Sequence, residues 1–433
     1  MNFQNVNKPN PLLYGANKEF FSTFRLAIRM NSTVDYDLLS RSVERVMVRY
    51  PYFCVSPERD GDNLVLRYND RPLPVFPDDR AVTLGSDESR GHLISFGCKD
   101  KTVFIDASHY LTDGMGIDPL MKSLLYLYAS ECYGTEGLQR EKIRMSDSAP
   151  CEGEYAYPFP DEVAEEEGEA FFQEAKEAYS LDCNAFDNKG LYAYHLRIPQ
   201  REMMIKASSS DGSPVSFLSV MLYRAFHKLD QSIDKPIVAH VQHQYRAMLK
   251  APISHYSLVN YISVSLSPRI KDWDVEKQNT VVRGQVILKG ENDACAKDVN
   301  RLMSAFLGKS SFGAKKVSMA RYAEKSIQGK TFGISYVGKM DWCGLDRYVE
   351  DMHAYIGEKY TENMLLLEVM TVGEDFSLNF MQSGKGEKYL NAFMEEIRAL
   401  DIPVRLVGEE RYTLCNTDLL IKKNDLYGES VGV

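Results

Sequence analysis

The chain has 433 residues, of which 44% are hydrophobic and 26% charged, an ordinary composition for a globular protein with two or three domain-sized units. Its formal net charge of -10 argues against a nucleic-acid backbone as the main partner, because that role needs clustered positive charge. No apolar run approaches the roughly 20 residues that span a bilayer, and the eight cysteines are scattered without a C-x-x-C pair. We therefore expect a cytoplasmic protein with no nucleic-acid partner, no integral membrane segment and no metal site.

The first half of the chain begins with a strand pattern followed by a helix pattern. Its predicted elements are strands over 24–30 and 102–107 and helices over 34–47 and 117–128. Pro51 follows the first helix pattern and ends it. Residues 146–168, with three prolines and an acidic run, predict an exposed connector. We place the end of the first unit just after this connector, so that the unit comprises residues 1–175.

The second half, residues 176–433, repeats the alternation of strands and helices. Its predicted elements are strands over 191–198, 237–245, 365–369 and 376–381 and helices from Ser213 onward and over 389–400. The last two strands are joined by a turn at Gly373 and lead into a helix, as residues 93–128 do in the first half. This overlay puts Gln382 in the place of His109, which indicates a duplicated unit that kept one catalytic copy.

The segment Ser108–Gly114 contains an H-x-x-x-D-G pattern between a predicted strand and a predicted helix. The pattern places His109 at the end of a rigid strand. A histidine titrates near pH ~6.5 when unperturbed, so a neutral imidazole there can accept a proton. Gly114 and Gly116 allow a sharp backbone turn after it. The segment predicts a site at which His109 accepts a proton as a base.

His109, Asp113 and Gly114 in this pattern resemble the active-site motif of the chloramphenicol acetyltransferase-like superfamily, which includes condensation domains and alcohol acetyltransferase-like acyltransferases. Further stretches are similar to that family in the same order along the chain: Val34–Phe53, Ser213–Ser216, Ile237–Arg246 with Asn260, and Phe332–Met340. The resemblance implies an α/β fold of two acyltransferase-like subdomains. Each would be a mixed β-sheet with flanking helices, and the two would form a V-shaped pseudo-dimer.

The same resemblance implies roles for single residues. His109 would be the general base that moves an acyl group from a CoA or carrier-protein thioester to an alcohol or amine. Asp113 would pair with Arg246 and, with Gly114, hold the turn rather than take part in chemistry. Ser335 or Tyr336 would donate a hydroxyl to the oxyanion or line the substrate tunnel.

Asn260 and Ser108 complete the set of candidate oxyanion or tunnel-lining residues. The implied co-substrate is acyl-CoA or a phosphopantetheine thioester, with no cofactor tightly bound. The implied partners are a small-molecule acyl acceptor and, as an alternative source of the acyl group, an acyl or peptidyl carrier protein.

Two other functions stay open. One is a free-standing nonribosomal-peptide-type condensation enzyme that forms an amide, and the other is a non-catalytic binding protein of the same fold. Ser108 stands where condensation domains usually carry the first histidine of H-H-x-x-x-D-G. His240 and His243 form an H-x-x-H pair, but residues three apart on a strand face opposite sides and cannot share a metal ion.

Overall fold

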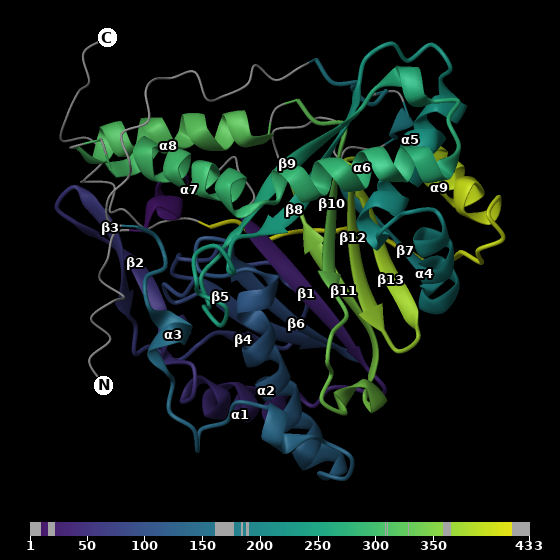
Figure 1. The fold of residues 1–433 in the computed structure, drawn as a ribbon. Helices are drawn as coiled ribbons and strands as arrows, with labels where there is room; N and C mark the ends of the chain where they lie inside the picture. Colours follow the sequence, from purple (N-terminus) through teal and green to yellow (C-terminus); the bar gives the residue numbers. More distant parts are fainter. Residues whose placement is uncertain are drawn as a thin grey trace.

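Two mixed β-sheets make up most of the strand structure (Figure 1). The computed structural model describes residues 10–15, 22–160, 177–182, 185–187, 190–307, 309, 311–327, 329–357 and 365–417. Within these ranges the strands form a five-stranded sheet in the order β11-β1-β6-β5-β4 and a seven-stranded sheet in the order β14-β7-β13-β12-β10-β8-β9. Both contain parallel and antiparallel pairs, so the expected α/β fold with two mixed sheets is confirmed.

The first sheet is built mainly by the first half of the chain. Its strands are β1 (Thr23–Met30), β4 (Val75–Phe76), β5 (Ile94–Lys99), β6 (Thr102–Ser108) and β11 (Val349–Ile356). The other elements of this half are α1 (Tyr36–Met47), the hairpin of β2 (Val55–Asp60) and β3 (Asn63–Tyr68), α2 (Gly114–Tyr133) and the short α3 (Glu152–Tyr155). The predicted strands and helices of this half are confirmed.

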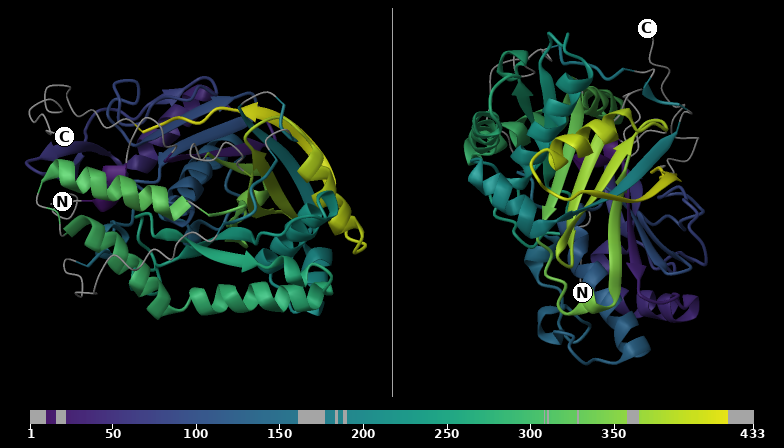
Figure 2. Two further views of the ribbon diagram at one scale, coloured as in Figure 1. Left: turned by 90° about the horizontal axis from the view of Figure 1, so that it is seen from above. Right: turned by 90° about the vertical axis from the view of Figure 1, so that its right-hand side faces the viewer.

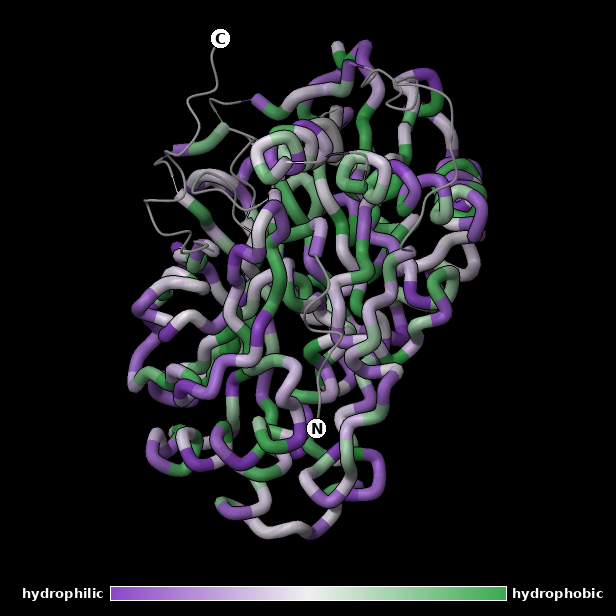
Figure 3. The backbone as a smooth tube through the Cα atoms, turned by 90° about the vertical axis from the view of Figure 1, so that its left-hand side faces the viewer, coloured by the Kyte–Doolittle hydropathy of each residue, from purple (hydrophilic) through white to green (hydrophobic). Residues whose placement is uncertain are grey.

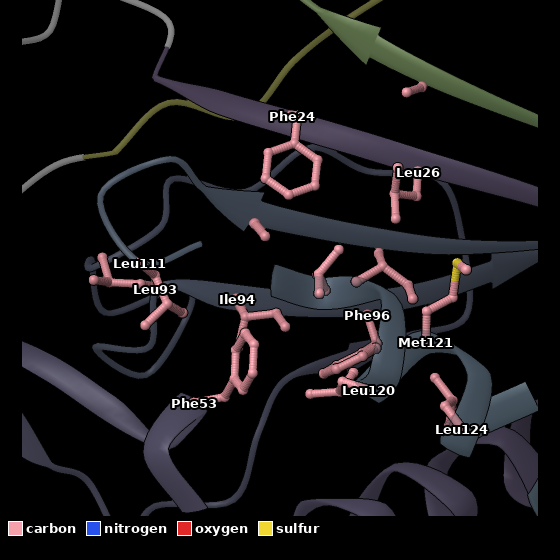
Figure 4. Close-up of a cluster of buried hydrophobic side chains, with 14 of the residues drawn as sticks. Phe24, Leu26, Phe53, Leu93, Ile94, Phe96, Leu111, Leu120, Met121 and Leu124 are labelled. Carbon is pink, nitrogen blue, oxygen red and sulfur yellow. The ribbon is translucent and has the colours of Figure 1, made fainter. Parts of the chain in front are cut away.

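Helices α1 and α2 pack against each other, and α2 covers one face of the first sheet. Figure 4 shows how side chains from β1, β5 and α2 meet beneath that face. Asp35 caps α1 by accepting a hydrogen bond from the backbone N–H of Leu38 at 2.8 Å, which explains why the helix begins there. The strand that carries His109 is therefore anchored in a continuous apolar core.

The second sheet comes from the second half of the chain. Its strands are β7 (Leu191–Pro199), β8 (Ile237–Gln244), β9 (Val259–Leu266), β10 (Phe332–Gly338), β12 (Leu365–Val372), β13 (Asp375–Gln382) and β14 (Arg405–Tyr412). The helices are α4 (Gln200–Ser209), α5 (Pro214–Leu229), α6 (Val275–Lys289), α7 (Asn292–Leu307), α8 (Phe312–Ile327) and α9 (Lys388–Arg398). The predicted start of α5 is confirmed, since Ser213 caps it and Pro214 is its first residue.

Helices α4, α5 and α9 cover the outer face of the second sheet, whereas α8 and α9 lie at opposite ends of the molecule (Figure 2). The sequence patterns predict none of the following described elements: β2, β3, β4, α3, α4, β9, α6, α7, α8, β11 and β14. Figure 3 shows hydrophobic stretches along the interior strands and hydrophilic stretches in many outer turns.

Strand β11 links the two sheets. It belongs to the second half of the chain but pairs with β1 in the first sheet, Phe24 opposite Ile356 (Figure 1). It also lies over β12 and β13 of the second sheet, where Asn379 Nδ2 donates to the carbonyl of Ala354 at 2.8 Å. The predicted boundary near residue 175 stays a prediction, because residues 161–176 lie outside the described ranges.

Residues alternate between the two faces of β12. Leu365, Leu367 and Val369 join the apolar core under α5 and α9, whereas Leu366 and Met370 face the first sheet. Glu368 has the same parity as Leu366 and Met370 and so lies on the face toward the first sheet. The space between the sheets is therefore lined by alternate residues of both.

Candidate active site

The space between the sheets holds a pocket with His109 in its wall. The pocket encloses about 800 Å³, counting its open mouth. Its described lining comes from β1, the turn between β6 and α2, α2 itself, β8, β9, β10, β11 and β12. His109 directly follows the last residue of β6, as the sequence pattern predicts. Both sheets thus contribute walls around one histidine.

The surroundings of His109 keep its imidazole neutral. Its ring lies against the ring of Phe24, with centroids 4.7 Å apart. Burial lowers the pKa of His109, although the charge of Asp113 and a hydrogen bond to the Thr112 backbone act in the opposite direction. A neutral imidazole has one donor and one acceptor nitrogen. His109 is therefore able to accept a proton near pH 7.

Asp113 and Arg246 form a buried pair beside the pocket. Arg246 Nη1 and Nη2 donate to the two carboxylate oxygens of Asp113 at 2.8 and 2.7 Å. Asp113 also accepts the backbone N–H groups of Gly116 and Leu258, both at 2.8 Å, and caps α2. Arg246 additionally donates to the carbonyl of Tyr256 at 2.9 Å. The pair that the resemblance implies is present, and it joins the turn after His109 to the segment after β8.

Gly116 provides the space that this junction needs. A Cβ atom at Gly116 would lie 2.3 Å from the carbonyl oxygen of His255, whereas a Cβ at Gly114 would meet nothing within 4 Å. Neither glycine has a positive φ, so the sharp turn expected here does not depend on the conformational freedom of glycine. Gly116 instead allows the backbone at His255 to approach α2.

We expect Gly116→Ala to lower the free energy of unfolding by about 1–3 kcal/mol, because the new methyl group forces two backbone segments apart. Gly114→Ala is the matched control two residues away. It should be neutral or stabilising by up to about 1 kcal/mol, because alanine restricts the unfolded chain. Urea denaturation of both variants measures the difference, and equal losses would contradict the close approach at Gly116.

A second buried ion pair lies behind the first. Arg49 donates to both carboxylate oxygens of Glu154 at 2.9 and 2.7 Å, and the hydroxyl of Tyr52 donates to the same carboxylate at 2.7 Å. These bonds lower the pKa of Glu154 to about 2, although burial alone would raise it. The backbone N–H of His255 donates to the carbonyl of Glu154 at 2.8 Å. The expected exposed connector is therefore wrong at Glu154, which is buried because it neutralises Arg49.

A row of polar side chains crosses the inner face of the second sheet. Ser335 on β10 lies opposite Glu368 on β12 in the strand register, and its hydroxyl donates to Glu368 Oε1 at 3.0 Å. The same hydroxyl oxygen also lies within hydrogen-bond distance of Gln242 Oε1 on β8, so its single proton can be donated to either partner. All three line the pocket with His109, as does the half-buried Tyr336. The structure thus brings His109, Ser335 and Tyr336 together.

Other candidate residues lie outside this pocket wall. The Ser108 hydroxyl is buried and accepts from Thr417 Oγ1 at 3.0 Å. Asn260 Nδ2 donates to the Tyr322 hydroxyl at 3.3 Å on the far side of β9. Gln382, at the end of β13, donates to the carbonyl of Gly384 at 2.9 Å. Each of these three side chains thus makes its hydrogen bond outside the pocket that holds His109.

Glu368 is the residue that the sequence analysis missed. Glu368 is the single ionisable residue of the buried strand Leu365–Val372. This is unusual, because buried strands rarely carry an unpaired charge. It is only 2% exposed, and its Oε2 has no hydrogen-bond partner among the described residues. Burial raises the pKa of Glu368 to about 8, while the bond from Ser335 acts weakly in the opposite direction.

This raised pKa predicts a pH-dependent stability. Since the folded state holds the proton more tightly than the unfolded state, Glu368 lowers stability as the pH rises from about 5 to 8. The free energy of unfolding of Glu368→Gln should therefore rise relative to that of the natural protein by roughly 2–4 kcal/mol between pH 5 and 8, because each pKa unit corresponds to about 1.4 kcal/mol. Glu368→Asp keeps a carboxyl group and should retain the pH dependence. Denaturation experiments from pH 5 to 8 measure this gain. If the difference in free energy of unfolding between Glu368→Gln and the natural protein stayed constant over that range, Glu368 would not hold a proton in the folded state.

The described residues contain no group of three or more histidine, cysteine, aspartate or glutamate side chains arranged to hold a metal ion. Among the helices that the structure describes, none is long and apolar enough to cross a membrane. His240, the first residue of the H-x-x-H pair, is buried against the ring of Tyr261 at a centroid distance of 5.8 Å.

No protein-family model and no curated protein matches the chain in sequence. Solved structures do match. Fusarium sporotrichioides TRI101, solved with coenzyme A and T-2, has a TM-score of 0.58 at 9% identity over 91% of this chain and 97% of its own. Polyketide synthase associated protein 5 from Mycobacterium tuberculosis has a TM-score of 0.57 at 13% identity, over 90% and 96%.

A condensation-domain structure concerned with chain release from the enacyloxin polyketide synthase matches with a TM-score of 0.51 at 10% identity, over 91% of this chain and 83% of its own. At these identities the matches show the fold. The chain has the fold that these three structures share, in agreement with the α/β fold that the sequence resemblance implies.

Proposed function

We propose that this protein is an acyltransferase in which His109 is the general base. The observation that carries the proposal is a neutral imidazole in the wall of a pocket that both sheets line. His109 takes the proton of an acceptor hydroxyl or amine, whose oxygen or nitrogen then attacks the carbonyl carbon of a thioester. The carbon–sulfur bond breaks, and the proton passes from His109 to the leaving thiolate.

The residues around His109 support this role by positioning it. Asp113 has both carboxylate oxygens engaged by Arg246, so we assign these two residues to holding the turn. Ser335 or Tyr336 donates to the oxyanion of the tetrahedral intermediate. For Ser335 this requires its hydroxyl to turn away from Gln242 or Glu368. Ser108 and Asn260 are assigned no part in the reaction.

The donor we assign is acyl-CoA or the phosphopantetheine thioester of a carrier protein, bound only as a co-substrate. Five methionines line the pocket and give it an adaptable apolar wall suited to an acyl chain: Met115, Met121, Met340, Met352 and Met370. The presence of coenzyme A in the TRI101 structure of the same fold is consistent with this donor. The acceptor is a small-molecule alcohol or amine.

A second candidate is a free-standing condensation enzyme that forms an amide with a carrier-bound substrate. The similarity to a condensation domain favours it. The two candidates differ in their donor, because the condensation enzyme requires a carrier protein where the first candidate also accepts free acyl-CoA.

Release of free thiol tests the proposal. The natural protein is incubated with acetyl-CoA, or with an acetylated carrier protein, and a panel of alcohols and amines. We expect acceptor-dependent thiol release with at least one donor. Release from the carrier protein alone would favour the condensation enzyme. If neither donor released thiol above background, acyl transfer would be refuted, and a non-catalytic binding protein would be the remaining function.

A further inference from the structure

Glu368 is a carboxyl group without a counter-ion in the wall of the pocket. Two other carboxyl groups line the same pocket, and each has a cation: Asp113 pairs with Arg246 at 2.7 Å and Asp118 pairs with Lys122 at 2.7 Å. No lysine or arginine is among the described residues that line the pocket. Glu368 is therefore the one described lining carboxyl group that a bound ligand can neutralise.

The hydrogen bonds around Glu368 leave one oxygen for that ligand. Ser335 has a single hydroxyl proton and lies within hydrogen-bond distance of both Gln242 Oε1 and Glu368 Oε1. When Glu368 is protonated on Oε1, it donates to Ser335, which then donates to Gln242. In either protonation state Oε2 lacks a described partner. A buried polar atom of this kind is unfavourable unless something binds it.

The rest of the pocket suits an ammonium group on an apolar chain. Burial lowers the pKa of His109, so its imidazole does not repel a cation near pH 7. The other titratable groups that line the pocket are Asp113 and Asp118 on α2 and Tyr336 on β10, none of which is a cation. The methionine side chains offer apolar surface to the methylene groups beside an amine.

We propose that the pocket binds a substrate bearing a cationic amine, whose ammonium group pairs with the Glu368 carboxylate while the reacting group lies at His109. This inference rests on the proposed acyl transfer and narrows its substrates. The ammonium group belongs either to the acyl acceptor or to the acyl group, and two experimental arms distinguish these sources.

The first arm compares two acceptors with acetyl-CoA. The pair is 4-aminobutan-1-ol and pentan-1-ol, which differ by an ammonium in place of a methyl group. The second arm compares 3-aminopropanoyl-CoA and butanoyl-CoA, which again differ by an ammonium in place of a methyl group, with a neutral alcohol. We expect the cationic member to have the higher kcat/KM by about tenfold or more in one arm, since hydrogen bonds to charged groups are the strong ones. Glu368→Gln should reduce that ratio to about one.

Two variants serve as controls. Asp118→Asn removes a lining carboxyl group that already has Lys122 as its partner, and it should keep the amine preference. Glu368→Asp retains a carboxyl group and should recover part of the preference. Equal kcat/KM values in both arms, or a preference that survives in Glu368→Gln, would overturn the inference while leaving acyl transfer intact.

A binding measurement tests Glu368 without turnover. Calorimetry with 4-aminobutan-1-ol near pH 7, in buffers of different ionisation enthalpy, should show release of about one proton, because the bound ammonium favours the ionised carboxylate. Glu368→Gln should release none. Binding without proton release would overturn the inference even if no acceptor turned over, and so separates its failure from failure of the proposed function.

Discussion

Replacing His109 with alanine should lower kcat by about 10²–10⁴-fold, the usual contribution of a general base. The expected loss follows from its position, because the described pocket lining offers no other histidine. KM for the acceptor should change little, since the imidazole acts mainly in the transition state. The measurement is thiol release from acetyl-CoA with whichever acceptor the natural protein uses.

The pH profile gives a second readout. Activity of the natural protein should fall as the pH drops through the lowered pKa of His109, because the protonated imidazole cannot accept a proton. His243→Ala is a matched control, since His243 lies on β8 outside the described pocket lining. If His109→Ala and the natural protein released thiol at the same rate above background, His109 would not be the base.

Asp113→Asn should destabilise the fold by about 3–5 kcal/mol, the usual effect of breaking a buried ion pair. The substitution leaves the Arg246 guanidinium buried, at 5% exposure, without its carboxylate. Arg246→Met should cause a loss of similar size by leaving Asp113 with only backbone donors. The double variant should lose less free energy of unfolding than the two single variants together. With both residues replaced, no charged group is left buried without its partner.

Glu395→Gln is the control for this pair. Glu395 pairs with Lys228 at 2.9 Å, but both side chains are about half exposed, so its loss should change stability by less than about 1 kcal/mol. Chemical denaturation measures all four variants. A free energy of unfolding of Asp113→Asn equal to that of the natural protein, together with lost activity, would make Asp113 a participant in the reaction.

The local elements around His109 could be predicted because their evidence lies within short windows. A run of β-branched and aromatic residues predicts β6, helical spacing predicts α2, and Ser213 with Pro214 predicts the start of α5. The pairing of Asp113 with Arg246 joins positions far apart in the chain, and only the family resemblance pointed to it.

The parts that the sequence could not supply depend on long-range packing. Glu154 looked like part of a solvated connector because its partner Arg49 is distant in sequence. His255 carries no motif, yet its carbonyl defines why residue 116 must be glycine. Glu368 could have been noticed in the sequence as an acidic residue in the middle of an apolar strand. That it lies buried without a cation beside it is seen only in the folded chain.

The pairing of β1 with β11 also shapes how the chain folds during synthesis. Phe24 leaves the ribosome long before its partner Ile356, by a delay on the order of tens of seconds at about 5–20 residues per second. Until then β1 is an edge strand with unsatisfied backbone groups, which is the arrangement that favours aggregation. The first sheet is therefore completed late and by a contact of high sequence separation, so the two halves of the chain reach their native structure together.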